Sequence, residues 1–293
     1  MPLTTTFPQE IFDLFIDCRS NDPRCLSRFS LVARAWTIGA RRHLFRHIVF
    51  TNDNRAEAFL CLFRSHPATF ARHIQELDFM NRENAWQHPN LSLSWRCILR
   101  VISQLNEAEA HNVHSMTLSK LTDVEARPEM RTQLLGNVGS LQLQYVQFYD
   151  HNGLRQFLTY FTGLQSLEIE VPPTVPLVAS APIDELDILS PDVLSQLRSL
   201  NLSLAFRSPL LSWFARNTSL MHRLSECTLS LDSDVLVQHS DDLGKTLTSL
   251  APSLHELVVQ FYILPRSITP GKTIISFVLI TSLNPSSQTS SNL

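Results

Sequence analysis

The chain has few of the residues and runs on which several common protein classes depend. Only 7 of its 293 residues are glycine, and only Gly39 lies before position 136, so there is little material for glycine-rich phosphate-binding loops. The five cysteines are odd in number and scattered, which indicates reduced thiols rather than a disulfide framework. The chain has no apolar run of bilayer-spanning length and no secretory signal at its start. We therefore expect a cytoplasmic or nuclear protein without a membrane partner.

Charge is also scarce. Charged residues make up 17% of the chain and hydrophobic residues 44%, which excludes a disordered chain and an exposed coiled coil. The formal net charge of −3 gives no general attraction to nucleic acid, so we expect no nucleic-acid partner. The length suits one or two domains, or one array of repeats.

The first fifty residues read as a small helical unit. In "FPQEIFDLFIDC", Pro8 suits the first turn of a helix. Apolar residues then follow at helical spacing and predict one stripe: Ile11, Leu14, Phe15 and Cys18. In "NDPRCLSRFSLVARAW", Asp22 is placed to cap a second helix that starts at Pro23. Apolar residues on one face of this helix form a second stripe: Leu26, Phe29, Ala33 and Trp36.

A third short helix and a strand complete this unit. The basic segment "ARRHLFR" is followed by "HIVF", which is rich in strand-forming residues. Three helices in about 45 residues enclose little core, and units of this size usually depend on a partner or a neighbouring domain.

Residues 5–50 resemble an F-box, in the version common in fungal F-box proteins. The resemblance rests on Phe7-Pro8, Glu10-Ile11, Ser30-Leu31-Val32 and Trp36, together with the leucines between them. It implies docking to a Skp-type adaptor and, through it, to a cullin-RING ubiquitin ligase, with this chain choosing the protein substrate. The residues expected to contact the adaptor are Phe7, Pro8, Ile11, Leu14, Leu26, Leu31, Val32 and Trp36. For Trp36 we expect a role in the core of the unit as well.

Residues 51–70 read as a linker helix with Phe59, Leu62 and Phe63 facing inward. From 71 to 265, apolar residues recur at positions i, i+3 and i+5, and the central residues lie between 21 and 39 residues apart. The triplets are Ile74/Leu77/Phe79, Val113/Met116/Leu118, Leu143/Val146/Phe148, Leu164/Leu167/Ile169, Leu197/Leu200/Leu202, Leu224/Cys227/Leu229 and Leu254/Leu257/Val259. Irregular periods of this length are typical of a strand-and-connection solenoid.

These triplets resemble degenerate leucine-rich repeats, about seven in number, of the kind that often follow an F-box. The family's asparagine or cysteine three residues after each triplet is missing, so no asparagine ladder is expected. Residues 171–191 carry five prolines and read as an extended rim loop, either a binding loop or an insertion. Residues 266–293 read as an irregular Ser/Thr-rich tail. The expected fold is therefore α/β, with a three-helix unit followed by an irregular solenoid with a parallel sheet.

No residues suggest catalysis. His43/His47 and His111/His114 have helical spacing, but no acidic or cysteine ligand accompanies them at metal-site spacing. The common nucleophile, zinc-protease and phosphate-loop motifs are missing from the sequence. We expect no enzyme activity, no cofactor and no metal. One alternative stays open: a structural or scaffolding repeat protein, unrelated to ubiquitination, in which the leading helices cap the repeats.

Overall fold

The computed structural model describes residues 9–32, 34–65, 70–81, 92–122, 124–148, 153–171, 195–204, 222–232, 253–262 and 278–282, and the single residues 244 and 248. Phe7, Pro8, most of the 171–191 loop and most of the 266–293 tail lie outside the described residues. The helices are α1 (Gln9–Asp17), α2 (Pro23–Val32), α3 (Arg34–Leu44), α4 (Asp53–Ser65), α6 (Trp95–Glu107), α7 (Gln133–Asn137) and α8 (Gly153–Leu158), with single 3-10 turns η1 (Ala71–His73) and η4 (Pro128–Met130).

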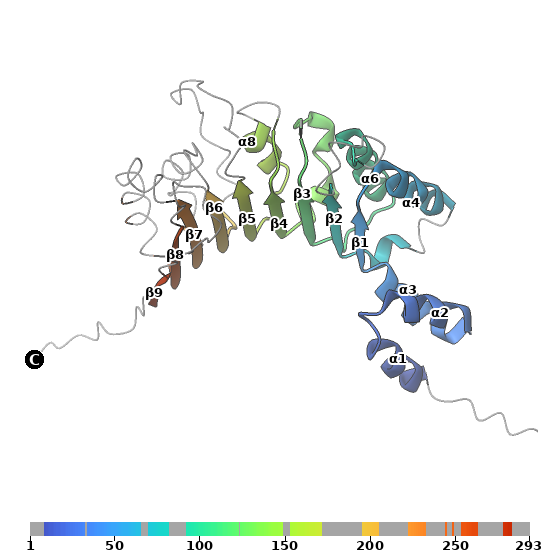
Figure 1. Cartoon of the computed structure of the whole chain (residues 1–293). Coiled ribbons are helices and arrows are strands. Elements are labelled where there is room, and N and C mark those ends of the chain that lie inside the picture. Colours follow the sequence, from blue (N-terminus) through green and yellow to red (C-terminus); the bar gives the residue numbers. More distant parts are fainter. Residues whose placement is uncertain are drawn as a thin grey trace, which may run out of the picture.

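All the strands belong to one sheet. They are β1 (His47–Phe50), β2 (Glu76–Met80), β3 (Ser115–Ser119), β4 (Ser140–Gln144), β5 (Ser166–Val171), β6 (Ser199–Leu204), β7 (Glu226–Asp232), β8 (Glu256–Tyr262) and β9 (Val278–Ser282). They lie side by side in chain order, with β1 to β8 parallel and β9 antiparallel to β8 (Figure 1). The expected α/β class, with short helices followed by a parallel sheet, is confirmed.

The apolar triplets lie on the strands because of the period of two in a β-strand. The in-register pairing of β1 to β8 aligns two inward rows across the sheet. The first row is Ile48, Leu77, Met116, Leu141, Leu167, Leu200, Cys227 and Leu257; the second is Phe50, Phe79, Leu118, Leu143, Ile169, Leu202, Leu229 and Val259. Six of the seven predicted triplets contribute their last two residues to these rows.

The triplet Leu143/Val146/Phe148 is wrong. On β4 the inward residues are Leu141 and Leu143, which are preceded by the buried Val138. Both choices satisfy the same i, i+3, i+5 spacing, so the sequence offers two registers five residues apart. Burial decides between them, because Val146 and Phe148 are only half-buried in the turn after the strand.

The backbone repeats more regularly than the side chains. At the start of each strand from β2 to β8, two consecutive N–H groups donate to one carbonyl oxygen of the preceding unit, at N···O distances of 2.7–3.2 Å. The accepting carbonyls belong to Arg46, Gln75, His114, Gly139, Gln165, Arg198 and Ser225. Because only main-chain atoms take part, any residue with a main-chain N–H group is tolerated at these positions, which excludes only proline.

One asparagine holds a turn between strands. The Asn81 side chain, directly after β2, accepts from the Leu93 N–H at 2.6 Å and donates to the Lys120 carbonyl at 3.1 Å. Asn81 lies two residues after Phe79, the last residue of its triplet, whereas the leucine-rich-repeat pattern has its asparagine three residues after the triplet. It therefore ties the first long connection to the turn after β3.

The helices between the strands pack on the apolar side of the sheet, and Figure 1 shows α4, α6 and α8 along the row of strands. The segment predicted as a linker helix is α4, which places Ala56, Leu60 and Phe63 in the main core. Leu62 is exposed, which corrects its predicted inward position, and Phe59 is half-buried beside Phe63. The main core is one continuous cluster that runs from Phe50 to Val259.

Two glycines allow neighbouring connections to approach closely. The N–H of Gly163 donates to the carbonyl of Gly136 at 3.0 Å. A Cβ atom on Gly163 would lie 2.6 Å from that carbonyl oxygen, whereas a Cβ on Gly136 would meet only the Thr162 hydroxyl, at 3.2 Å. The first contact is with main chain, which cannot move without shifting the helix, and the second is with a side chain that can rotate.

We therefore expect Gly163→Ala to lower the free energy of unfolding by about 1–3 kcal/mol, the usual cost of overpacking. Gly136→Ala is the matched control. It lies in α7 and gains helix propensity, so its effect should stay within about 1 kcal/mol. Urea unfolding followed by circular dichroism measures both, and equal losses would contradict the close approach.

Candidate binding surfaces

The N-terminal helices begin as the sequence indicates. The Asp22 carboxylate accepts from the N–H groups of Arg24 at 3.0 Å and Cys25 at 3.1 Å. Hydrogen bonds from Cys25 lower the pKa of Asp22, as expected of a carboxylate that caps a helix. The prediction that this helix extends to Trp36 is wrong, since α2 ends at Val32 and Trp36 belongs to α3. The Thr37 hydroxyl donates to the Ser30 carbonyl at 3.1 Å and ties the two helices together.

The three helices enclose a small core of their own. Ile16, Leu26 and Ala40 are almost fully buried, yet they do not belong to the main core beneath the sheet. The Trp36 ring contacts Phe12 and Phe29, with ring centroids 5.3 and 4.9 Å apart. These contacts hold α1 and α2 against α3.

Two further contacts fix α1 on α3. A Cβ on Gly39 would lie 2.9 Å from Cδ1 of Ile16, so the glycine lets the helices approach closely. The His43 ring also hydrogen-bonds the Asp17 carboxylate at 2.7 Å. Packing therefore uses Phe12, Ile16 and the Gly39 side of α3, while Ile11, Leu14 and Phe15 of the predicted apolar stripe face outward.

Large apolar side chains are exposed on all three helices. Their exposed fractions run from 38% for Ile11 to 84% for Leu31. We call the set the apolar N-terminal surface; its members are Ile11, Leu14, Phe15, Leu31, Val32 and Ile38. Among the described residues, only Leu62 and Tyr145 are other large hydrophobics with comparable exposure.

The predicted adaptor-binding residues divide into three groups. Ile11, Leu14, Leu31 and Val32 belong to the apolar N-terminal surface. Leu26 is 1% exposed and belongs to the interior of the helical unit, while Trp36 is half-buried in its aromatic cluster. Phe7 and Pro8 lie outside the described residues.

Phe15 and Ile38 were not among those predicted residues. Ile38 lies two positions from both Trp36 and Ala40, which places it on the opposite side of α3. The sequence signal for Ile38 was its spacing of two residues from Trp36, which puts an apolar side chain on the outer side of the helix when the aromatic ring faces inward. Phe15 was predicted only as part of the apolar stripe, because periodicity alone does not tell which face of an amphipathic helix meets its neighbour.

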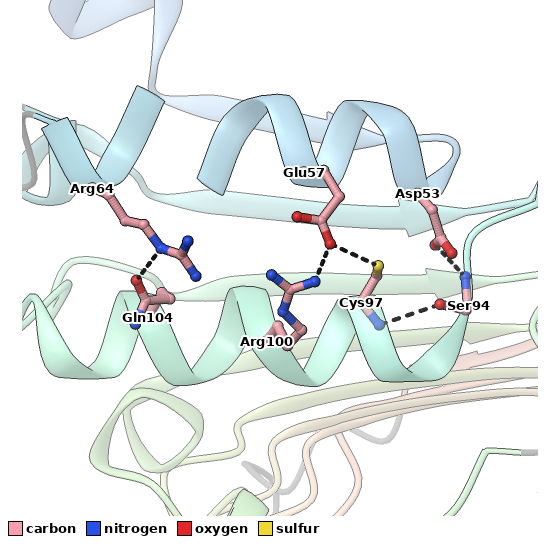
Figure 2. Close-up of polar contacts among 7 residues, drawn as sticks. All are labelled: Asp53, Glu57, Arg64, Ser94, Cys97, Arg100 and Gln104. Carbon is pink, nitrogen blue, oxygen red and sulfur yellow. Dashed lines mark hydrogen bonds and ion pairs between the residues drawn. The ribbon is translucent and has the colours of Figure 1, made fainter. Parts of the chain in front are cut away.

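The densest polar cluster joins α4 to α6 (Figure 2). Glu57 pairs with Arg100 and accepts from the Cys97 thiol at 3.7 Å, and Asp53 accepts from the Ser94 N–H at 2.7 Å. Burial raises the pKa of the Cys97 thiol, which keeps it protonated and a poor nucleophile. The cluster therefore links two helices and shows no activated catalytic group.

Three of the histidines found at helical spacing in the sequence contact separate acidic side chains. His43 bonds Asp17, whereas His47 bonds Asp78 at 2.7 Å, and His111 lies 4.0 Å from Glu109. Within the described ranges, no three His, Cys, Asp or Glu side chains are arranged to hold a metal ion. In the same part of the chain, no helix has the length and apolar character needed to cross a membrane.

Comparison of the sequence with protein-family models finds no match, and comparison with curated proteins finds no significant match.

The cysteines should react according to their burial. Cys18 and Cys61 are exposed, whereas Cys97 and Cys227 are buried, and burial raises the pKa of Cys227 to about 12. In native protein at mildly alkaline pH, iodoacetamide should modify Cys18 and Cys61 and spare Cys97 and Cys227 until denaturant is added. Peptide mass spectrometry gives the four rates. If Cys97 reacts as fast as Cys61, the α4–α6 cluster contains an accessible nucleophile after all.

Proposed function

We propose that the chain is a non-catalytic substrate receptor of a cullin-RING ubiquitin ligase. It binds a Skp-type adaptor through α1 to α3 and a protein substrate through the strand array. The observation that carries this proposal is the distribution of exposed apolar side chains. Among the described residues, six of the eight large exposed hydrophobics lie on the three short N-terminal helices.

The energetics of these helices favour a partner. Full burial of one leucine or isoleucine side chain contributes roughly 1.5–3 kcal/mol, and these helices leave several such side chains in water while enclosing only a small core. Exposed apolar residues concentrated on one small unit are typical of a protein interaction site. The resemblance of residues 5–50 to an F-box supplies the identity of that partner, a Skp-type adaptor.

The strand array supports the second half of the proposal. Strands in chain order, two inward apolar rows and a repeated pair of backbone hydrogen bonds are typical of a solenoid. We propose that it is an irregular leucine-rich-repeat solenoid, with β1 providing an additional Phe45/Ile48/Phe50 triplet before those predicted. Its role is positioning: a substrate held on the array is kept at high effective concentration near the ligase, in the cytoplasm or nucleus.

The alternative is a scaffold in which the leading helices only cap the repeats. A cap would use its apolar residues against the neighbouring strands, but the apolar N-terminal surface is open to solvent and the unit has its own core. These features favour the receptor.

The test is the affinity of the full chain for a recombinant Skp-type adaptor. We expect the double substitution Leu14→Lys/Leu31→Lys to weaken binding at least about thirtyfold, since truncated interface anchors commonly cost 2 kcal/mol or more. Both side chains are exposed, so the melting temperature should not change. Isothermal titration calorimetry and circular dichroism measure the two quantities.

Leu62→Lys is the matched control because Leu62 is an exposed leucine on α4, outside the proposed interface. It should bind the adaptor like the wild type. The receptor proposal fails if the wild-type chain binds no better than the double variant. A fall in melting temperature of the double variant, without a change in adaptor binding, would favour the capping alternative.

A further inference from the structure

The sheet has a second face, formed by the residues that alternate with the buried rows. On β2 to β8 the outward residues whose side chains the structure describes are Glu76, Asp78, Met80, Ser115, Thr117, Ser119, Ser140, Gln142, Gln144, Ser166, Glu168, Glu170, Ser199, Asn201, Ser203, Glu226, Thr228, Ser230, Glu256, Val258 and Gln260. Every charged residue among them is acidic. The strands β2 to β8 contain no lysine or arginine at all.

The carboxylates at the two ends of this face differ in their partners. On β2, Glu76 lies 3.7 Å from Arg46, and Asp78 bonds His47 at 2.7 Å. Among the described residues, Glu168, Glu226 and Glu256 have no ion-pair partner. These three carboxylates lie on β5, β7 and β8; together with Glu170, which accepts a hydrogen bond from the Tyr145 hydroxyl, we call them the acidic sheet face.

Two of these carboxylates occupy an unfavourable position. Glu226 and Glu256 are register partners on β7 and β8, so their backbones are about 4.8 Å apart. Like charges directly opposite each other destabilise a sheet. A cation from outside the described chain would relieve this repulsion and bind to both groups.

The other carboxylates extend the negative charge along the sheet. Glu168 and Glu170 lie on β5, about 7 Å apart as alternate residues of one strand. Glu168 is two strands and two residues away from Glu226, because its register row reaches β7 at Thr228, so the two backbones are about 12 Å apart. This separation exceeds the Debye length of about 8 Å in physiological salt. Each pair of carboxylates therefore attracts a cation largely on its own, and a segment that meets all four side chains must extend across β5 to β8.

Accessibility and the neighbouring residues narrow the class of partner. Glu226 and Glu256 are exposed, Glu168 and Glu170 are half-buried, and no described helix packs on this side. Serine, threonine, asparagine and glutamine surround them, which offer hydrogen bonds to a peptide backbone. Among the outward residues of β2 to β8 whose side chains the structure describes, only Met80 and Val258 are apolar, so an apolar partner gains little over these positions. Nucleic acid and acidic proteins would be repelled.

We propose that the acidic sheet face binds an extended segment of a partner protein that is rich in arginine or lysine. This inference deepens the proposed function. It rests on that function in one respect only, namely that the basic partner is the substrate of the ligase. The affinity of the face for a basic segment is a separate property, and it can be measured without the adaptor.

The experiment uses the full chain and three labelled peptides, in which arginine, glutamine or glutamate alternates with serine. Fluorescence anisotropy should detect binding of the arginine peptide alone, and the affinity should fall as salt is raised. Glu226→Gln/Glu256→Gln and Glu168→Gln/Glu170→Gln should each weaken binding about tenfold or more. These substitutions remove negative charge without changing shape, so neither should lower the melting temperature.

Glu107→Gln/Glu109→Gln is the matched control, because it changes net charge equally at the end of α6 and away from the sheet. It should bind the arginine peptide within about twofold of wild type. Equal binding of the glutamine peptide, or an equal loss in the control variant, would overturn the inference. Leu14→Lys/Leu31→Lys should keep peptide binding and Glu226→Gln/Glu256→Gln should keep adaptor binding, so each proposal can fail alone.

Discussion

The whole array depends on one backbone interaction, the carbonyl group that accepts two consecutive N–H groups at the start of the next strand. Each accepting residue, from Gln75 to Ser225, is itself a donor to the unit before it. The interaction fixes the register of every parallel pair at the same point. A slip of one residue would turn all the buried side chains of a strand to the open side. The connections between strands can therefore vary in length without disturbing the core.

The inward rows could be predicted because each strand has two apolar residues at alternate positions, and a further buried residue lies three positions before the first of them. Six triplets were placed correctly for this reason. β4 was misplaced because residues 138–148 satisfy the same spacing twice, and only packing separates the two registers. The backbone hydrogen bonds could not be predicted, since glutamine, histidine, glycine, arginine and serine all occupy the accepting positions.

The candidate surface on the N-terminal helices was predicted in composition but not in orientation. The apolar stripe of α1 was recognised, but the sequence did not show that it faces outward, which follows from the close packing of Ile16 against Gly39 of α3. Leu26 was expected to contact the adaptor because a resemblance identifies positions in the sequence but does not show which of them are buried. The acidic sheet face was not anticipated, since its carboxylates are dispersed over about 90 residues and only strand pairing brings them together.

The connection between the helical unit and the sheet is very short. α3 ends at Leu44 and β1 begins at His47, and the two intervening residues are both held: the Phe45 ring lies 4.3 Å from that of Phe70, and the Arg46 carbonyl accepts two hydrogen bonds from the start of β2. This connection allows little rotation of the helical unit relative to the sheet. A partner bound to the helices and a partner bound to the sheet are therefore held in a relative orientation that this short connection fixes.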